Sequence, residues 1–174
     1  MSFGDGVTEP RGVLATPDVQ EYEMAENGAV IDSYAPFSYA VQQVQQYNGV
    51  PNAVVYSPRT AGAIDRLCEA VNLQPLRPPA SFDGLSKFVT RQVPDDMDQG
   101  TSTGVASCAV VGDYSQILMA LAPSENGTPG GIRVDVSRDL GFQSLSLMVR
   151  VWARFDCAIL RPRFFSVVKG ILAS

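Results

Sequence analysis

The stretch GTSTG at residues 100–104 matches the glycine-x-serine-x-glycine pattern around the nucleophile of many hydrolases. In that chemistry the serine occupies a sharp turn after an apolar strand and before a helix, within reach of a general base. Here residues 94–99 (PDDMDQ) read as a loop, and the apolar run, Ala106–Val111, comes after Ser102. The chain has no histidine to serve as the base. We therefore predict that Ser102 lies in a flexible loop and is not a nucleophile, and a small serine hydrolase is the alternative.

Acidic side chains occur in two patterns that could bind a metal or transfer protons. The run Asp96–Gly100 resembles the start of a calcium loop, but Ser107 stands at the twelfth position, where such a loop has glutamate. Glu21, Glu23 and Glu26 could pair as acid and base, but no groove-forming pattern positions them. We expect both groups to be solvated. The sequence predicts no catalytic residue, no metal and no cofactor.

Three cysteines, Cys68, Cys108 and Cys157, lie far apart in the sequence. No Cys-x-x-Cys pair is present and there is no histidine to complete a zinc site. Each cysteine falls inside an apolar pattern. Because free cysteine is among the most buried residue types, we predict that all three lie in the core.

Composition limits the partners of the chain. At 174 residues, with 45% hydrophobic and 18% charged residues, it fits a single soluble globular unit. The net charge of −5 should repel phosphate backbones, which predicts no sequence-specific binding of nucleic acid. No apolar run approaches the roughly 18 residues of a membrane span, and the first twelve residues lack the pattern of a signal peptide. We therefore predict no membrane partner and a cytoplasmic location.

Hydrophobic periodicity predicts two helices separated by a short strand. Apolar residues recur every three or four positions over residues 37–47, which gives one stripe on a helix. Residues 53–56 (AVVY) then form a short apolar run that predicts a buried strand. Ser57 precedes a proline and is the predicted N-cap of a second helix, whose apolar stripe extends over residues 61–71.

A proline-rich loop and further strands follow. Residues 72–84 contain three prolines and predict a stiff surface loop. Apolar runs predict strands at residues 85–93, 106–111 and 132–136, and a short helical or extended piece at residues 116–122.

The segment LSLMVRVWARFDCAIL, residues 145–160, alternates with a strict period of two. Its odd positions, including Val151, are all apolar, and its even positions include Arg150, Arg154 and Asp156. This predicts one strand with a buried face and a charged face for solvated or intersubunit ion pairs. Sixteen residues would span roughly 50 Å, against a diameter of about 40 Å for a compact chain, so the strand bends or the molecule is elongated. Burial further predicts that Val151→Asp costs several kcal/mol.

The order of several motifs resembles the major capsid proteins of tailed bacteriophages, the Hong Kong 97 type. These motifs are FGDGVTEPRGVL, PNAVVYSPRTAGAIDRL, LSKFVT, VVGDYSQILMAL, IRVDVSRDLGF and LMVRVWARFDCAILRPRFFSVVKGI. The resemblance covers nearly all of the chain. It implies an α+β fold, with a mixed central sheet flanked by helices in an axial domain and long β-strands that extend into a partial peripheral domain.

The resemblance also implies how the chain is divided. Residues 13–131 would form mainly the axial domain, residues 132–160 the long strands of the peripheral domain, and residues 161–174 a return to the axial domain. Nothing corresponds to the family's N-terminal arm, extended hairpin loop or spine helix, so the chain resembles the C-terminal half of a capsid subunit. Residues 143–146 (QSLS) stand where some members have a crosslinking asparagine, which predicts no isopeptide bond.

The function implied is that of a structural subunit, without catalysis, in the icosahedral head of a tailed phage or prophage. It would be found in the virion capsid, and in the host cytoplasm before assembly. Full-length subunits of this family self-associate into pentamers and hexamers, whereas this chain alone is expected to be a monomer or weak oligomer. An encapsulin-type cargo shell is the alternative. Because prolines keep a loop ordered at little entropic cost, we expect one loop to lie at the symmetry axis. Its residues are Asn72, Pro75, Arg77, Pro78, Pro79 and Asp83.

Overall fold

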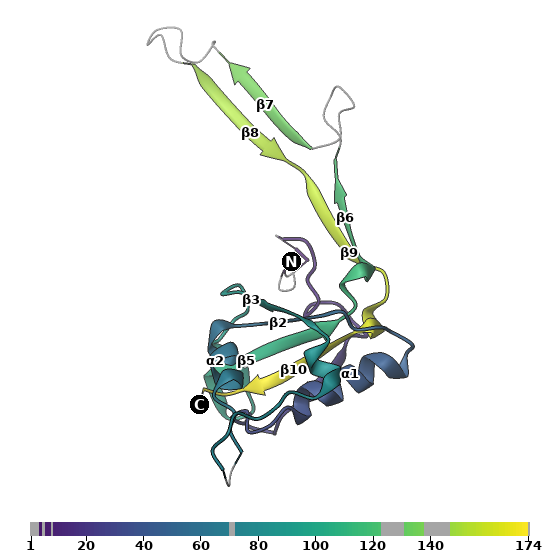
Figure 1. Cartoon of the computed structure of the whole chain (residues 1–174). Helices are drawn as coiled ribbons and strands as arrows, with labels where there is room; N and C mark the ends of the chain where they lie inside the picture. The colour runs from purple at the N-terminus through teal and green to yellow at the C-terminus, as the bar shows by residue number, and fades with distance from the viewer. Residues whose placement is uncertain are drawn as a thin grey trace. The chain divides into compact units, whose positions relative to one another are not determined.

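The computed structural model describes residues 4, 6–7, 9–69, 72–122, 131–137 and 147–173. Its contacts divide the chain into two compact units, Met1–Ile117 with Ile159–Ser174 and Leu118–Ala158. The first unit holds a mixed sheet with helices, and the second is made of paired strands (Figure 1). The predicted α+β class is confirmed.

The sheet of the first unit is built around a long central strand, β5. Its order is β1 (Gln20–Glu23), β10 (Phe165–Ile171), β5 (Ser102–Gly112), β2 (Ala53–Tyr56) and β3 (Ser86–Val89), and β4 (Met97–Gln99) pairs with the start of β5. Strands β10 and β2 run antiparallel to β5, whereas β1 is parallel to β10 and β3 is parallel to β2. The central position of β5 explains its apolar run at residues 106–111, because both faces of this part of the strand are covered.

Helix α1 (Ala35–Gln46) forms where the apolar stripe predicted it. The stripe is buried at Phe37, Ala40, Val41 and Val44. Helix α2 (Pro58–Asp65) begins at the predicted N-cap, because the backbone N–H of Thr60 donates to Ser57 Oγ at 3.2 Å.

The predicted extension of the second helix to residue 71 is wrong, because α2 ends at Asp65. The chain instead turns back on itself after the helix. The backbone N–H of Leu76 donates to Leu67 O at 2.8 Å, and Cys68 forms an isolated antiparallel bridge with Pro75. These contacts replace the helical bonds that the stripe would have continued. Residues 70–71 lie outside the described residues.

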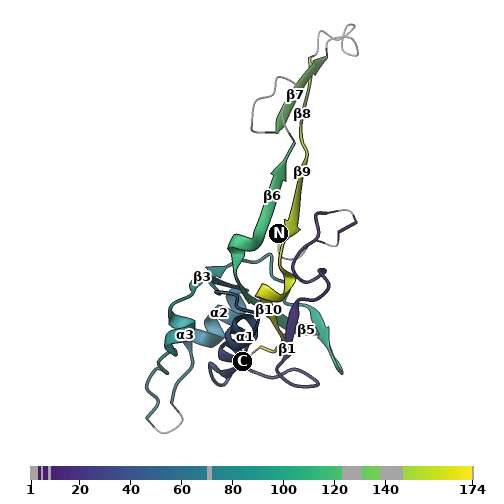
Figure 2. The ribbon, with the colours of Figure 1, turned by 90° about the vertical axis from the view of Figure 1, so that its right-hand side faces the viewer.

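Apolar side chains form a core on each face of the sheet. On one face, residues of α1, α2 and the short helix α3 (Ala80–Asp83) pack against Ala109 and Val111 of β5 and Val168 of β10. Figure 2 shows the three helices gathered on this side. On the other face Cys108 and Val110 pack with further apolar side chains. The alternation of β5 thus supplies both cores.

The burial predicted for the cysteines is confirmed at two positions. Cys108 and Cys157 are buried, but Cys68 is exposed because α2 stops before it. Burial raises the pKa of the Cys108 thiol to about 12, so this side chain stays neutral in the apolar core.

Several strand predictions need new limits. The strand expected at residues 85–93 is only β3 (Ser86–Val89), and the one expected at 106–111 is the eleven-residue β5. The residues before Gly100, which read as a loop, contain β4. The piece expected at residues 116–122 is the 3₁₀ turn η1 (Tyr114–Gln116) followed by strand β6 (Ile117–Leu121). The strand expected at 132–136 is confirmed as β7 (Ile132–Ser137).

The second unit consists of two ribbons, each made of two paired strands. Strand β7 pairs with β8 (Met148–Ala153) in antiparallel register, and β6 pairs with β9 (Phe155–Ile159). The predicted single strand over residues 145–160 is therefore interrupted at Arg154, whose carbonyl accepts from the backbone N–H of Ala122 at 3.0 Å. Residues 143–146, for which the resemblance predicts no crosslink, lie outside the described residues.

The predicted buried face of this strand is wrong within the single chain. Val149, Val151 and Phe155 are all about half exposed or more, and Val151 is 63% exposed. Of the apolar odd positions in the described part of the segment, Cys157 is the buried one. The reason is architectural, since each ribbon has only two strands and cannot cover its own face. Among the described residues, no helix has the length and apolar character needed to cross a membrane.

Candidate functional site

Ser102 lies in a tight β-hairpin between β4 and β5, not in the flexible loop that the sequence predicted. It is the first residue of β5 and pairs with Gln99 across the turn. Gly100 supports this turn with a left-handed φ of 56°. The Ser102 hydroxyl donates to the backbone carbonyl of Asn27 at 2.8 Å. A strand–turn–strand with its serine proton on a carbonyl is not a nucleophile elbow, which needs a helix after the turn.

Replacing Ser102 tests this assignment. Ser102→Ala should lower the free energy of unfolding by about 0.5–1 kcal/mol, because it removes one partly exposed hydrogen bond. Thr103→Ala, at an exposed position of the same strand, is the control. Urea titration measures both variants, and a serine-reactive phosphonate should leave the parent unlabelled. Stoichiometric labelling at Ser102 would contradict the structural role.

The acidic groups that the sequence singled out are separated in the structure. Glu21 pairs with Lys169 on the neighbouring strand at 2.6 Å, and Asp98 accepts from the backbone N–H of Gly104 at 2.7 Å. Within the described parts of the chain, no three acidic or cysteine side chains gather in a way that could hold a metal ion. These carboxylates stabilise the edge of the sheet and the hairpin.

The proline-rich segment is a surface excursion closed at its base. The backbone N–H of Glu69 donates to Gln74 O at 2.8 Å, and Tyr34 Oη donates to Leu76 O at 3.4 Å. Pro79 is the N-cap of α3, so the loop predicted over residues 72–84 ends where this helix begins, and Asp83 belongs to the helix. The members of the predicted axis loop that lie before the helix and are exposed are Asn72, Pro75, Arg77 and Pro78.

One face of the β7–β8 ribbon carries a closed polar network. Asp135 accepts from Arg150 Nη2 at 2.7 Å, from Arg150 Nε at 3.2 Å and from Trp152 Nε1 at 2.8 Å. The guanidinium groups of Arg133 and Arg154 lie 4.9 and 5.1 Å from the centre of the Trp152 ring. The ribbon therefore satisfies this face by itself.

The three charged residues predicted for this strand have separate contacts. Arg150 bonds to Asp135, Arg154 stacks on Trp152, and Asp156 Oδ1 accepts from the backbone N–H of Cys157 at 2.8 Å. Asp135 and Trp152 were not among the residues predicted from the sequence. The period-two pattern placed Trp152 beside Arg150, but only the β7–β8 register brings Asp135 opposite that pair.

Acid should open this network. Hydrogen bonds from Arg150 and then Trp152 lower the pKa of Asp135, so its contribution is present at neutral pH and is lost as the pH falls below the ordinary aspartate range near about 4. Trp152 is the only tryptophan, so its fluorescence reports the change directly. We expect a transition in acid that Asp135→Asn abolishes. A transition that persists in this variant would assign it to another group.

The opposite face of the same ribbon is entirely apolar. The register pairs Ile132 with Ala153, Val134 with Val151, and Val136 with Val149. All six side chains are exposed. We call these six residues the apolar ribbon face.

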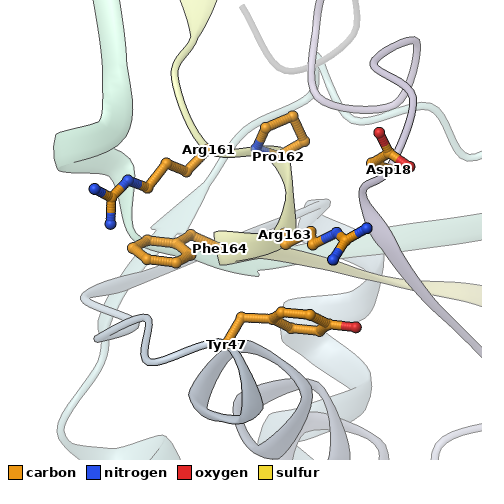
Figure 3. Close-up of a pocket in the computed structure, with 6 residues that line it drawn as sticks. All are labelled: Asp18, Tyr47, Arg161, Pro162, Arg163 and Phe164. Atoms are coloured by element: carbon orange, nitrogen blue, oxygen red, sulfur yellow. The ribbon is translucent and has the colours of Figure 1, made fainter.

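A shallow pocket of about 280 Å³ lies in the first unit, beside the 3₁₀ turn η3 (Pro162–Phe164). Arg163 lies over the Tyr47 ring at 5.1 Å, and Arg161 lies over the Phe164 ring at the same distance. Figure 3 shows the two guanidinium groups extending in opposite directions, with Asp18 beyond Arg163. The two guanidinium charges therefore do not converge on one point of the pocket.

No protein-family model matches the sequence, and no curated protein matches it. Solved structures do match. A structure from Mycobacterium phage Ogopogo is 19% identical with a TM-score of 0.63, over 94% of this chain and 56% of that one. The capsid of the native GTA particle is 16% identical with a TM-score of 0.65, over 97% of this chain and 58% of that one. The holo-SrpI encapsulin complex from Synechococcus elongatus PCC 7942 is 15% identical with a TM-score of 0.63, over 92% and 56%.

The chain has the Hong Kong 97-type fold. The fold implied by the sequence motifs is therefore confirmed. The alignments extend over nearly all of this chain, so they include residues of both compact units. The chain spans little more than half of the length of the structures it matches.

Proposed function

We propose that the chain is a structural subunit of the icosahedral head of a tailed phage or prophage. The observation that carries this proposal is the match of 97% of the chain to the capsid of the native GTA particle, at a TM-score of 0.65. Because a fold alone does not fix a function, the chemistry of the surface must also agree. Such a subunit would lie in the virion capsid, and in the host cytoplasm before assembly.

The chemistry of the described residues supports a non-enzymatic role. The Ser102 hydroxyl is bonded to a backbone carbonyl, and the Cys108 thiol is buried and neutral. Arg161 and Arg163, which line the pocket beside η3, point away from each other. An enzyme needs a nucleophile, base or charge cluster aimed at one point, and these groups are each engaged elsewhere.

The contacts of such a subunit would be geometric. Shell rings require heterologous, head-to-tail contacts between copies. We propose that the proline-rich loop lies at the ring axis with Asn72 at its exposed tip, because backbone hydrogen bonds between Glu69 and Gln74 and between Leu67 and Leu76 fix its base. The charged side chains Arg150, Arg154 and Asp156 are proposed to meet a neighbouring subunit. The division into axial residues 13–131 and 161–174 and peripheral residues 132–160 also remains part of the proposal.

An encapsulin-type cargo shell is the second candidate. The encapsulin complex from Synechococcus elongatus matches with the same TM-score, 0.63, as the structure from Mycobacterium phage Ogopogo. Both kinds of shell share this architecture, so the contents of the particle must decide between them.

The contents can be measured in the source cells. After prophage induction, particles are collected by sedimentation, and peptide mass spectrometry tests for this chain. We expect the chain in the particle fraction, together with nuclease-protected DNA. Protected protein cargo without DNA would favour the encapsulin candidate. A chain that is expressed but stays in the slow-sedimenting fraction, with particles present, would contradict both.

A further inference from the structure

We infer that the Asp113 carboxylate is a latch that holds together the two stretches of chain that leave and re-enter the first unit. The juxtaposition that carries the inference is one buried carboxylate that accepts hydrogen bonds from three residues, while the backbone N–H of the same residue donates to the returning chain. The inference concerns local opening within the first unit, so it goes beyond the proposed function and does not rest on it.

The carboxylate determines the conformation of the turn that leads into β6. Asp113 follows directly after β5 and is 8% exposed. Its Oδ1 accepts from Ser115 Oγ at 2.6 Å and from the backbone N–H of Ser115 at 3.1 Å, which caps η1. Its Oδ2 accepts from Gln116 Nε2 at 3.4 Å. Charge-assisted hydrogen bonds are about twice as strong as neutral ones, and a buried carboxylate is stable only with such donors around it.

Asn52 links the carboxylate to the sheet. The backbone N–H of Asn52 donates to Gly112 O at 3.0 Å and its carbonyl accepts from the backbone N–H of Ser86 at 3.0 Å, so the position of Asn52 is fixed on both sides. Its side chain then bonds in both directions. Nδ2 donates to Asp113 Oδ1 at 3.1 Å, and Oδ1 accepts from the backbone N–H of Tyr114 at 3.1 Å. The turn is therefore held against the start of β2.

The returning chain is bound at the same place. The backbone N–H of Asp113 donates to the carbonyl of Phe164, in η3, at 3.1 Å. The backbone N–H of Leu160 donates to Gln116 O at 3.0 Å. Gln116 immediately precedes β6 and Leu160 immediately follows β9, so this bond continues the pairing of the two strands. Asp113 thus contacts one stretch through its side chain and the other through its backbone.

Hydrogen bonds contribute more than burial to holding the two turns. None of the residues of η1 and η3 is buried, although Tyr114 and Phe164 pack partly against the second core. In the adjoining strands, by contrast, Val110 and Val167 are 0% and 1% exposed. Segments with few buried contacts open locally at a lower free energy than core strands do. Loss of the carboxylate should therefore release both turns while the sheet stays folded.

Amide hydrogen exchange of the full chain, measured by NMR, tests the latch. In Asp113→Ala, the backbone amides of Gln116 and Leu160 should exchange at least about tenfold faster. The acceptors of these two amides are backbone carbonyls and not the deleted carboxylate, so their release reports opening of the turns and not the loss of a single bond. The amides of β5 and β10 should keep the exchange rates of the parent.

Two further variants make the test specific. Asp98→Ala is the matched control, because it removes another carboxylate of the first unit, which accepts from the backbone N–H of Gly104 at 2.7 Å. It should leave the exchange of Leu160 unchanged. Asp113→Asn keeps one acceptor oxygen for Ser115 and should give a smaller increase than Asp113→Ala.

Four outcomes would overturn the proposal. Faster exchange at Ser115 alone would mean that the carboxylate holds only its own donors. An equal increase throughout β5 and β10 would mean that Asp113 supports the sheet as a whole, and failure of both Asp113 variants to fold would lead to the same conclusion. An equal increase at Leu160 in Asp98→Ala would make the effect a general one of removing a carboxylate.

Discussion

Phe165→Ala should lower the free energy of unfolding by about 3–5 kcal/mol, the cost of emptying a fully packed aromatic site. Phe165 opens β10 and is completely buried. Its ring packs edge-on against Tyr114 at 5.4 Å between centres. Gly112, opposite on β5, leaves space for the ring, because a Cβ at this glycine would collide with it. A site fitted so closely cannot collapse around the cavity, which places the cost at the high end.

Phe155→Ala is the matched control for this prediction. The substitution removes the same aromatic ring, but Phe155 lies on β9 and its side chain is 49% exposed. Its loss should cost less than about 1 kcal/mol. Urea titration followed by circular dichroism measures both. Equal losses would mean that the core of the first unit is not where the structure places it.

Val168→Asp should abolish cooperative folding of the first unit. Val168 is fully buried in the core beneath the helices, beside Ala109 and Val111. An unpaired carboxylate there costs several kcal/mol, which is comparable with the total stability of about 5–15 kcal/mol for a domain. The expected result is an insoluble protein or one without a sharp thermal transition in near-ultraviolet circular dichroism.

Val151→Asp provides the contrast, and it reverses the expectation from sequence. Because Val151 is largely exposed, the change should alter the stability of the dilute monomer by no more than about 0.5 kcal/mol. A Val168→Asp variant that keeps the parent's transition would show that Val168 is not buried. An unfolded Val151→Asp variant would show that Val151 is not exposed.

Periodicity predicted the elements whose burial arises within the chain. The apolar stripe from Phe37 to Val44 faces the sheet as α1, and the hydroxyl of Ser57 begins α2. The run at residues 106–111 is the centre of β5. In these cases local preference and tertiary packing agree, so the sequence pattern is sufficient.

Other elements could not be predicted because long-range pairing decides them. Strand β4 has only three residues, two of them polar, and exists through its pairing with β5. The stripe of α2 continues through Leu67, but a backbone hydrogen bond from Leu76 to that residue ends the helix first. Neither contact leaves a local signal in the sequence.

The long alternating segment shows a different limit. Alternation correctly identified which side chains share a face of β8, with Val149 and Val151 on one side and Arg150 and Trp152 on the other. It also predicted burial, which requires a covering layer that the described chain does not supply. The pattern identifies an apolar face, and only the structure shows whether that face is covered.

Electron cryomicroscopy of particles purified with this chain tests the central claim most directly. If the chain is a shell subunit, its β5-centred sheet should fit density repeated around five-fold and six-fold axes of a closed icosahedral wall, with the proline-rich loop towards each axis. Density for the chain only inside the wall, or on its outer surface as a decoration, would contradict the account.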